Sequence, residues 1–182
     1  MARLIMWNLI SLDGFFEGDG KWKIDWFQAI WNDEQHQHAL DQLRTANVLL
    51  FGRTTYEGMA DYWRSAEGDI AELMNSLPKV VVSRSLEGAD WNNTRLVRGD
   101  AVAEVANLKR TVDGNIFVFG SATLSATLTD ACLFDEYRVG LVPVILGSGT
   151  PLFKHSPNRI QLELLEARPF SSGCVVLRYA PR

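Results

Sequence analysis

Three short apolar runs constrain the fold of this chain more than any other feature of its sequence. They are VLLF at 48–51, VVVS at 80–83 and IFVF at 116–119, and longer amphipathic segments lie between them. Continuous apolar runs of this length are typical of strands buried on both faces of a sheet. Strands that alternate with helices are typical of a parallel sheet covered by helices. The sequence therefore predicts an α/β fold.

The same patterns predict the individual elements. Strands are expected at Arg3–Ile10, Val48–Phe51, Lys79–Ser83, Ile116–Phe119, Asp135–Val142, Ile160–Ala167 and Cys174–Ala180. Helices are expected at Asp33–Ala46, Glu67–Ser76, Ala101–Lys109 and Ser121–Ala131, and one more follows Gly52 with Thr54 or Thr55 as its cap and Glu57 in its first turn. The last third has little helical periodicity, and its two final strands, joined across RPFSSG, indicate an antiparallel hairpin.

Length and composition bound the class of protein. The chain has 182 residues, of which 47% are hydrophobic, and no internal repeat, so one domain over residues 1–182 is expected. The net charge of -4 comes without long runs of either sign, which argues against nucleic acid or an anionic membrane as a partner. No apolar stretch approaches the roughly 20 residues of a membrane span, and no cleavage site follows the N-terminus, so a cytoplasmic protein is expected.

Cysteines and histidines do not indicate a metal site. Cys132 and Cys174 are far apart in apolar surroundings, and both are expected to be buried, reduced thiols. His36 and His38 are two residues apart in a predicted helix and therefore point in different directions. His155 is expected at the surface, and no metal is predicted.

Three predicted strands end in glycine or serine turns before a helix, and Ser121, after the third strand, could cap the helix that follows. Helix N-termini offer free N–H groups and a partial positive charge, so phosphates fit at such turns without a basic surface. Arg53, after the first of them, would add a guanidinium to such a phosphate site. After the second, the hydroxyls of Ser83 and Ser85 and the guanidinium of Arg84 suit a phosphomonoester such as the 2'-phosphate of NADPH. The alternative is an ordinary turn whose arginine faces water. The spaced glycines of a dinucleotide fingerprint are absent after the first strand.

The loop after the first strand is rich in acids, glycines and aromatics. NLISLDGFFEGDGKW, at 8–22, leaves a buried strand for a loop of the kind that often holds ligands. Trp22, Trp26, Phe27 and Trp31 lie within ten residues, and they either stack a flat heterocycle or belong to the core. Pro143 lies inside a strand pattern before the loop Gly147-Ser148-Gly149, and it implies an edge, a bulge or a close approach to another group. The alternative is a turn shaped by glycine alone.

Five motifs together resemble a known family. They are SLDG at 11–14, FGRTTYE at 51–57, VVVSRSL at 80–86, FGSATL at 119–124 and DEYRVGLVPVILGSGTPLF at 135–153. In this order they resemble the riboflavin-biosynthesis reductase domain of the dihydrofolate-reductase-like superfamily, almost from end to end. The resemblance implies a three-layer fold around a mostly parallel sheet, with NADPH across the carboxyl ends of the strands.

The resemblance also implies roles for particular residues. Gly52, Arg53 and Thr54 would hold cofactor phosphates, Ser83 and Arg84 the adenosine 2'-phosphate, and Gly120, Ser121, Ala122 and Thr123 the diphosphate. The backbone of Asn8, Leu9 and Ile10 would line the nicotinamide ribose side, and Leu146, Gly147, Ser148 and Gly149 would close the far side.

Hydride transfer to a polarised C=N or C=O bond also needs a proton donor nearby. Asp13 is the family-matched acid, and a carboxyl group shielded from water can retain a proton near neutral pH. Asp25 competes for this role. The alternatives are a turn-forming role for Asp13 and a helix cap or solvated acid for Asp25.

These expectations define a leading function and its rivals. The resemblance implies a cytoplasmic NADPH-dependent oxidoreductase of riboflavin-biosynthesis type that acts on a pyrimidine- or pteridine-like heterocycle, similar to 5-amino-6-(5-phosphoribosylamino)uracil reductase. The zinc-deaminase signature of the bifunctional enzymes is absent, and the aromatic segment WKIDWFQAIW at 22–31 departs from the family's core pattern. Dihydrofolate reductase activity and a non-catalytic NADP-binding protein are the alternatives. A homodimer is expected, because the antiparallel end of the sheet leaves an edge to be covered.

Overall fold

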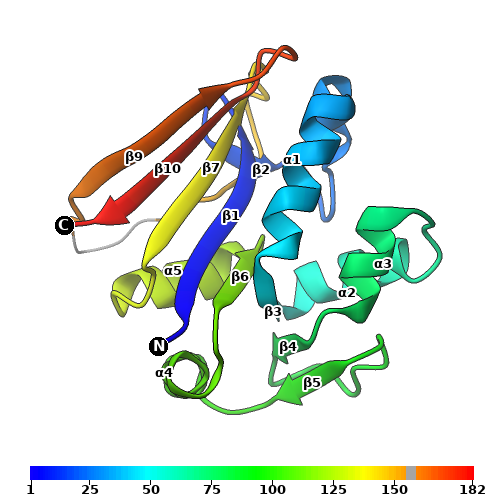
Figure 1. Cartoon of the computed structure of the whole chain (residues 1–182), viewed down its shortest axis with the longest axis vertical. Helices are drawn as coiled ribbons and strands as arrows, with labels where there is room; N and C mark the ends of the chain where they lie inside the picture. The colour runs from blue at the N-terminus through cyan, green and yellow to red at the C-terminus, as the bar shows by residue number, and fades with distance from the viewer. Residues whose placement is uncertain (155–158) are drawn as a thin grey trace.

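A mixed eight-stranded sheet forms the centre of the computed structural model, which describes residues 1–154 and 159–182 (Figure 1). Its strands lie in the order β5-β4-β3-β6-β1-β7-β10-β9. They are β1 (Arg3–Ser11), β3 (Ala46–Gly52), β4 (Lys79–Val82), β5 (Thr94–Val97), β6 (Asn115–Phe119), β7 (Glu136–Val142), β9 (Leu162–Pro169) and β10 (Val175–Pro181). All pairs from β5 to β7 are parallel, whereas β10 is antiparallel to both of its neighbours. The predicted α/β sheet with a C-terminal hairpin is confirmed.

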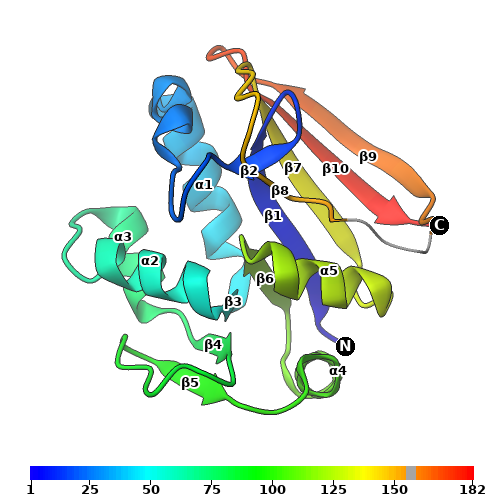
Figure 2. The same cartoon turned by 180° about the vertical axis from the view of Figure 1, so that it is seen from behind.

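Helices cover both faces of the parallel part of the sheet (Figures 1 and 2). One face carries α1 (Asp33–Arg44), α2 (Arg53–Trp63) and α3 (Asp69–Ser76), and the other carries α4 (Ala101–Thr111) and α5 (Ala122–Asp130). The cores on the two faces of the sheet explain why the sequence of strand β3 is continuously apolar. Val48 and Leu50 belong to the core beneath α4 and α5, while Leu49 and Phe51 belong to the core beneath α1, α2 and α3.

Several short elements were not predicted from the sequence. The 3-10 helix η1 (Asp25–Ile30) precedes α1, and β2 (Phe15–Glu17) pairs with β8 (Thr150–Pro151) in a separate small sheet. Strand β5 was missed because its mixed sequence is at most partly buried. The pairing of β2 with β8 joins loops far apart in the chain, so no local pattern predicts it.

Two local predictions were wrong. Helix α2 begins at Arg53 with Gly52 as its N-cap, so neither Thr54 nor Thr55 caps it and its first turn holds no acid. Cys132 is exposed rather than buried, because it lies in the turn after α5, where its backbone has a positive φ of 53°. Cys174 is buried as expected, and His155 lies outside the described residues.

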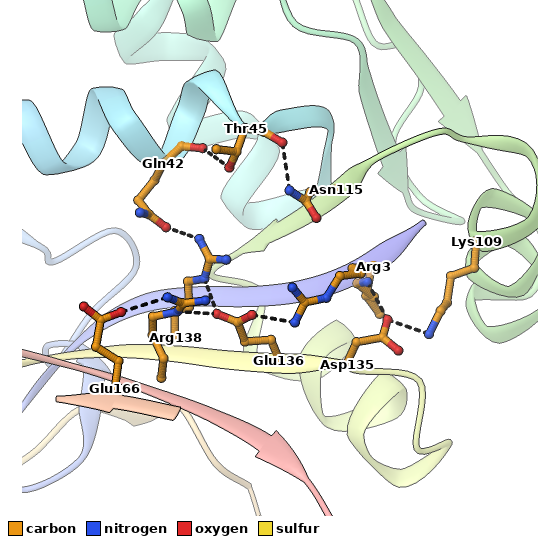
Figure 3. Close-up of polar contacts among 11 residues, drawn as sticks. Arg3, Gln42, Thr45, Lys109, Asn115, Asp135, Glu136, Arg138 and Glu166 are labelled. Carbon is orange, nitrogen blue, oxygen red and sulfur yellow. Dashed lines mark hydrogen bonds and ion pairs between the residues drawn. The ribbon is translucent and has the colours of Figure 1, made fainter. Parts of the chain in front are cut away.

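A buried carboxylate connects the parallel strands β1 and β7 with the antiparallel strand β10 (Figure 3). Glu136, in β7, is fully buried and accepts from Arg138 at 2.5 Å, from Arg178 of β10 at 2.7 Å and from Arg3 of β1 at 2.7 Å. Arg138 also donates to Gln42 of α1. Although burial by itself would raise the pKa of Glu136, hydrogen bonds from Arg178 and Arg138 and their charges hold it at about 2. The carboxylate is therefore ionised, and it links β1, β7, β10 and α1.

Candidate functional site

A cavity of about 1540 Å³ opens where the parallel strands end. Its lining includes the ends of β3, β4 and β6, a stretch of β1, and residues of α1, α2 and η1. Pockets for a single drug-sized ligand measure roughly 300–1,000 Å³. This cavity therefore has room for more than one ligand.

The β3–α2 and β6–α5 junctions are bonded directly to each other at the cavity floor. The Gly52 N–H donates to Ser121 Oγ at 2.7 Å, and the Ser121 N–H donates to Thr55 Oγ1 at 2.9 Å. A Cβ at Gly52 would lie 2.9 Å from Ser121 Oγ. At Gly120, which has a φ of +56°, it would lie 2.7 Å from Thr55 Oγ1. Both glycines are therefore required by the close approach of the two junctions.

These two junctions present two helix N-termini without side-chain caps. Gly52 and Ser121 are the N-cap residues of α2 and α5, and neither helix has a side-chain cap hydrogen bond. The prediction that Ser121 could cap its helix was wrong, since its hydroxyl is used by Gly52 and its backbone has a left-handed φ of 56°. The first-turn N–H groups lack intrahelical partners, and they carry the positive end of the helix dipole. The arrangement suits an anionic ligand.

The two arginines singled out by the sequence line the same cavity. Arg53 begins α2 and Arg84 follows β4, and both are exposed. Ser83 is buried, and its Oγ accepts from the N–H groups of Ser85 at 3.2 Å and Leu86 at 3.0 Å. Ser83 therefore shapes the loop that carries Arg84.

The other residues that line the cavity include some that the resemblance implied and some that it did not. Of the residues implied by the resemblance, Gly52, Thr54, Ala122 and Thr123 also line the cavity, together with Gly120 and Ser121. The sequence analysis missed the start of α4, where Gly99, Asp100 and Ala101 line it as well. Asp100 accepts from the Ala103 N–H at 2.8 Å, which in sequence is only an ordinary helix cap.

The side chain of Asn8 contributes more than the predicted backbone contact. Asn8 is buried, and its Oδ1 accepts from the Gly120 N–H at 2.6 Å. Its Nδ2 is buried without a partner among the residues that the structure describes, and the residue lines the cavity. Leu9 lines the cavity too, whereas Ile10 is buried away from it.

Asp13 lies outside the cavity, and the expectation of a shielded, protonated carboxyl group there was wrong. The residue is exposed and accepts from the N–H groups of Leu146 at 3.1 Å and Gly147 at 2.8 Å. A hydrogen bond from the Ser11 side chain, followed by these backbone bonds, lowers the pKa of Asp13. Asp13 is therefore an ionised anchor for the loop after β7.

That loop does not reach the cavity either. Leu146, Gly147, Ser148 and Gly149 are absent from its lining, and Thr150 is the neighbour that takes part. Two acids of the first loop do line it: Asp25, exposed at the start of η1, and Glu17. Glu17 is occupied, because it accepts from the Trp22 N–H and from the Thr150 hydroxyl at 3.2 Å.

The aromatic cluster is split between cavity and core. Trp22, Phe27 and Trp31 line the cavity, and Trp22 lies directly against α2 at Gly58, where a Cβ would collide with its ring. Trp26 does not line it, so its predicted substrate contact has no support in the geometry. The Trp26 indole donates to the Lys23 carbonyl at 3.2 Å, and its ring packs edge-on to Phe27 beside a small core that includes Phe170.

The described part of the chain contains neither a membrane-spanning helix nor a cluster of metal-binding side chains. No helix in residues 1–154 and 159–182 is long and apolar enough to cross a bilayer. Among the same residues, no three histidine, cysteine or acidic side chains come together as a metal site would require.

Comparisons with known proteins agree with this architecture. The family model of the RibD C-terminal domain matches residues 2–176. The uncharacterized protein YyaP of Bacillus subtilis (strain 168) is 31% identical over 182 residues, which cover 97% of this chain and 94% of that protein.

Solved structures show the same fold. A protein of Shewanella sp. PV-4 assigned to riboflavin biosynthesis has a TM-score of 0.79 at 22% identity, covering 100% of this chain and 99% of that one. Dihydrofolate reductase of Enterococcus faecalis, complexed with NADP(H), has a TM-score of 0.68 at 14% identity, covering 99% and 96%. The family match spans nearly all of the chain, and the protein therefore belongs to the RibD C-terminal domain family, with the fold of dihydrofolate reductase.

Proposed function

We propose that this protein is an NADPH-dependent reductase of a small, planar heterocycle of the pyrimidine or pteridine class. The observation that carries the proposal is the pair of uncapped helix N-termini, joined by the Gly52–Ser121 hydrogen bond of 2.7 Å, on the floor of a cavity that Arg53 and Arg84 also line. Membership of the RibD C-terminal domain family supports the same reading.

The residues present fit a phosphorylated dinucleotide. The N-termini of α2 and α5 would bind the diphosphate through their first-turn N–H groups. Arg84, on the loop shaped by Ser83, would bind the 2'-phosphate through its guanidinium. Asn8 Nδ2, buried without a partner, would donate to the nicotinamide half of the cofactor. When bound, the cofactor supplies the hydride.

The other half of the cavity would hold the substrate. Trp22, Phe27 and Trp31 supply aromatic surface there, and Asp25 lies in the same lining. Reduction of a C=N or C=O bond also needs a proton. With Asp13 outside the cavity and Glu17 occupied, Asp25 is the acid that we assign to deliver it, directly or through water.

The cofactor assignment is tested by comparing NADPH with NADH. We expect wild-type protein to bind NADPH more tightly, as measured by energy transfer from tryptophan to the dihydronicotinamide. Loss of charge-assisted hydrogen bonds to the 2'-phosphate in Arg84→Ala should weaken NADPH binding by about tenfold or more while leaving NADH binding nearly unchanged. Arg110→Ala removes an exposed arginine of α4 that bonds the nearby Asn107 and lies outside the cavity lining, and it serves as the control.

Other outcomes separate the rival functions. Equal affinity for NADPH and NADH in the wild-type protein would contradict the assignment of Arg84. Tight NADPH binding without turnover on any pyrimidine or pteridine would favour a non-catalytic NADP-binding protein. Oxidation of NADPH by dihydrofolate, blocked by methotrexate, would establish dihydrofolate reductase activity, which the structural likeness to that enzyme makes worth testing.

A further inference from the structure

Two ring nitrogens lie buried without a partner on the α1 side of the cavity. Trp7, in β1, and His38, in α1, both line it, and neither Trp7 Nε1 nor His38 Nε2 makes a hydrogen bond with any of residues 1–154 and 159–182. His38 is only 7% exposed, and its ring meets that of Trp7 edge to face with 6.3 Å between centroids. Buried polar groups are nearly always paired, so two unpaired ones side by side point to a ligand.

These two atoms are separate from the proposed cofactor contacts. Successive residues of a strand point to opposite faces of the sheet. Asn8 therefore points away from α1, where its Oδ1 bonds the Gly120 N–H, while Trp7 points toward α1 and packs on Phe119 with 5.1 Å between ring centroids. Trp7 and His38 thus mark a second region of the cavity.

The chemistry of the two nitrogens restricts the group that they can bind. An indole N–H only donates. Burial, followed by the charges of Arg168 and Arg138, lowers the pKa of His38, so its imidazole is neutral near pH 7, with one nitrogen donating and the other accepting. A carbonyl oxygen beside a ring N–H would satisfy both residues, with the oxygen accepting from Trp7 and the N–H donating to His38.

The surrounding residues favour a flat ring as the carrier of this group. Phe119 and Ala39 line the cavity next to the two nitrogens and are apolar. Gln35 lines it as well, but its amide already donates to Ser172 Oγ at 3.3 Å. We infer that Trp7 and His38 form a subsite that binds the lactam edge, O=C–N–H, of a planar heterocycle. The identity of that heterocycle as the substrate rests on the proposed function, whereas the subsite can be tested without turnover.

Binding of two bicyclic probes to the full-length protein tests the subsite. Lumazine carries a lactam edge on a pyrazine-fused ring, and quinoxaline keeps the pyrazine ring without that edge. By calorimetry, Trp7→Phe and His38→Leu should each weaken lumazine binding by about fivefold, the loss expected for one hydrogen bond, and leave quinoxaline binding unchanged. Both variants should melt at or above the wild-type temperature, because the atoms they delete have no partner in the protein.

Trp91→Phe is the matched control. The Trp91 indole donates to Asn75 Oδ1 at 2.7 Å and lies outside the cavity lining, so this variant should lose stability while binding lumazine as the wild type does. Undetectable lumazine binding, or equal lumazine affinity in Trp7→Phe and wild type, would overturn the inference and assign the two nitrogens to water. NADPH affinity, measured separately, reports on the proposed function, so the two can fail independently.

Discussion

Single atoms decide the geometry at the floor of the cavity. Ser121 Oγ accepts from the Gly52 N–H at 2.7 Å, and Thr55 Oγ1 accepts from the Ser121 N–H at 2.9 Å. The first bond occupies the hydroxyl of Ser121, the N-cap residue of α5, and the N-cap residue of α2 is Gly52, which has no side chain. The first-turn N–H groups of α2 and α5 are consequently left for a ligand.

Adding one methyl group at Gly52 tests this geometry. The new Cβ would lie 2.9 Å from Ser121 Oγ, so Gly52→Ala should push the two junctions apart. We expect a loss of about 1–3 kcal/mol in the free energy of unfolding, measured by denaturant titration, together with weaker NADPH binding. Gly88→Ala, where a Cβ meets nothing within 4 Å, should change neither quantity. Wild-type NADPH affinity in Gly52→Ala would show that the spacing of the two junctions is not important for the cofactor.

The proposed role of Asp25 as the proton donor is tested by replacing its carboxyl group with an amide. Because a positioned general acid contributes about 100-fold or more, Asp25→Asn should lower kcat by that factor without changing NADPH affinity. The measurement is NADPH oxidation with the best acceptor from a panel of pyrimidines and pteridines. Asp61→Asn, an exposed acid of α2, is the control. A loss of turnover in Asp13→Asn with full turnover in Asp25→Asn would reverse the assignment.

At the scale of the elements, the charged group around Glu136, shown in Figure 3, connects three strands and one helix. Three arginines from β1, β7 and β10 converge on one carboxylate, and Arg138 reaches on to Gln42 of α1. Arg138 is only 7% exposed, and its guanidinium lies 5.1 Å from the centre of the Phe117 ring. Removing the carboxylate would leave the buried charge of Arg138 without its negatively charged partner.

Glu136→Gln should therefore destabilise the protein by about 3–5 kcal/mol near pH 7. The pKa of Glu136 is lowered to about 2 in the folded protein from an ordinary value of 4.5, so its stabilising effect is complete above that ordinary value and is lost as the pH falls toward 2. The variant should accordingly show a weaker dependence of unfolding free energy on pH between these limits. Denaturant titrations at several pH values measure both effects, and the exposed Glu67→Gln is the control. A pH dependence as steep as that of the wild type would contradict the role of Glu136.

At the scale of the whole molecule, the exposed edge strand β9 bears on how the chain assembles. Among the described strands, β9 pairs only with β10, and all eight of its residues are exposed. Leu162, Leu164 and Leu165 are among the exposed large hydrophobic residues of the chain. A long edge strand with apolar side chains is prone to pair with another chain. We therefore expect a homodimer whose interface includes β9.

Light scattering after gel filtration should give twice the chain mass of 20.4 kDa. Leu164→Glu places a charge on the exposed edge and should shift the protein toward the monomer. Ala103→Glu places the same charge on the exposed side of α4 and should leave the mass unchanged. A wild-type mass of one chain would show that β9 has no partner in solution.

The sequence by itself determined the layers of the fold and the position of the rim. Apolar runs such as residues 48–51 are long enough to require burial on both faces, and that requirement is local. The β3–α2 and β6–α5 junctions were predictable for the same reason, since a glycine or serine that ends a strand before a helix is visible in a few neighbouring residues. The third predicted junction was wrong, because β4 leads through a loop to β5 and not to a helix. Because parallel strands end at one edge, Gly52, Arg53, Ser83, Arg84 and Gly120 could be placed together in advance.

Only the tertiary structure decided which polar atoms are free to act. Asp13 matched its motif, yet it bonds a loop more than 130 residues away in sequence and is not in the cavity. Trp7 and His38 had no motif, and their nitrogens stand out because no atom in the described residues pairs with them. Hydrogen bonding between distant segments leaves no local pattern in the sequence. The available donors and acceptors of the site are therefore known only once the chain has folded.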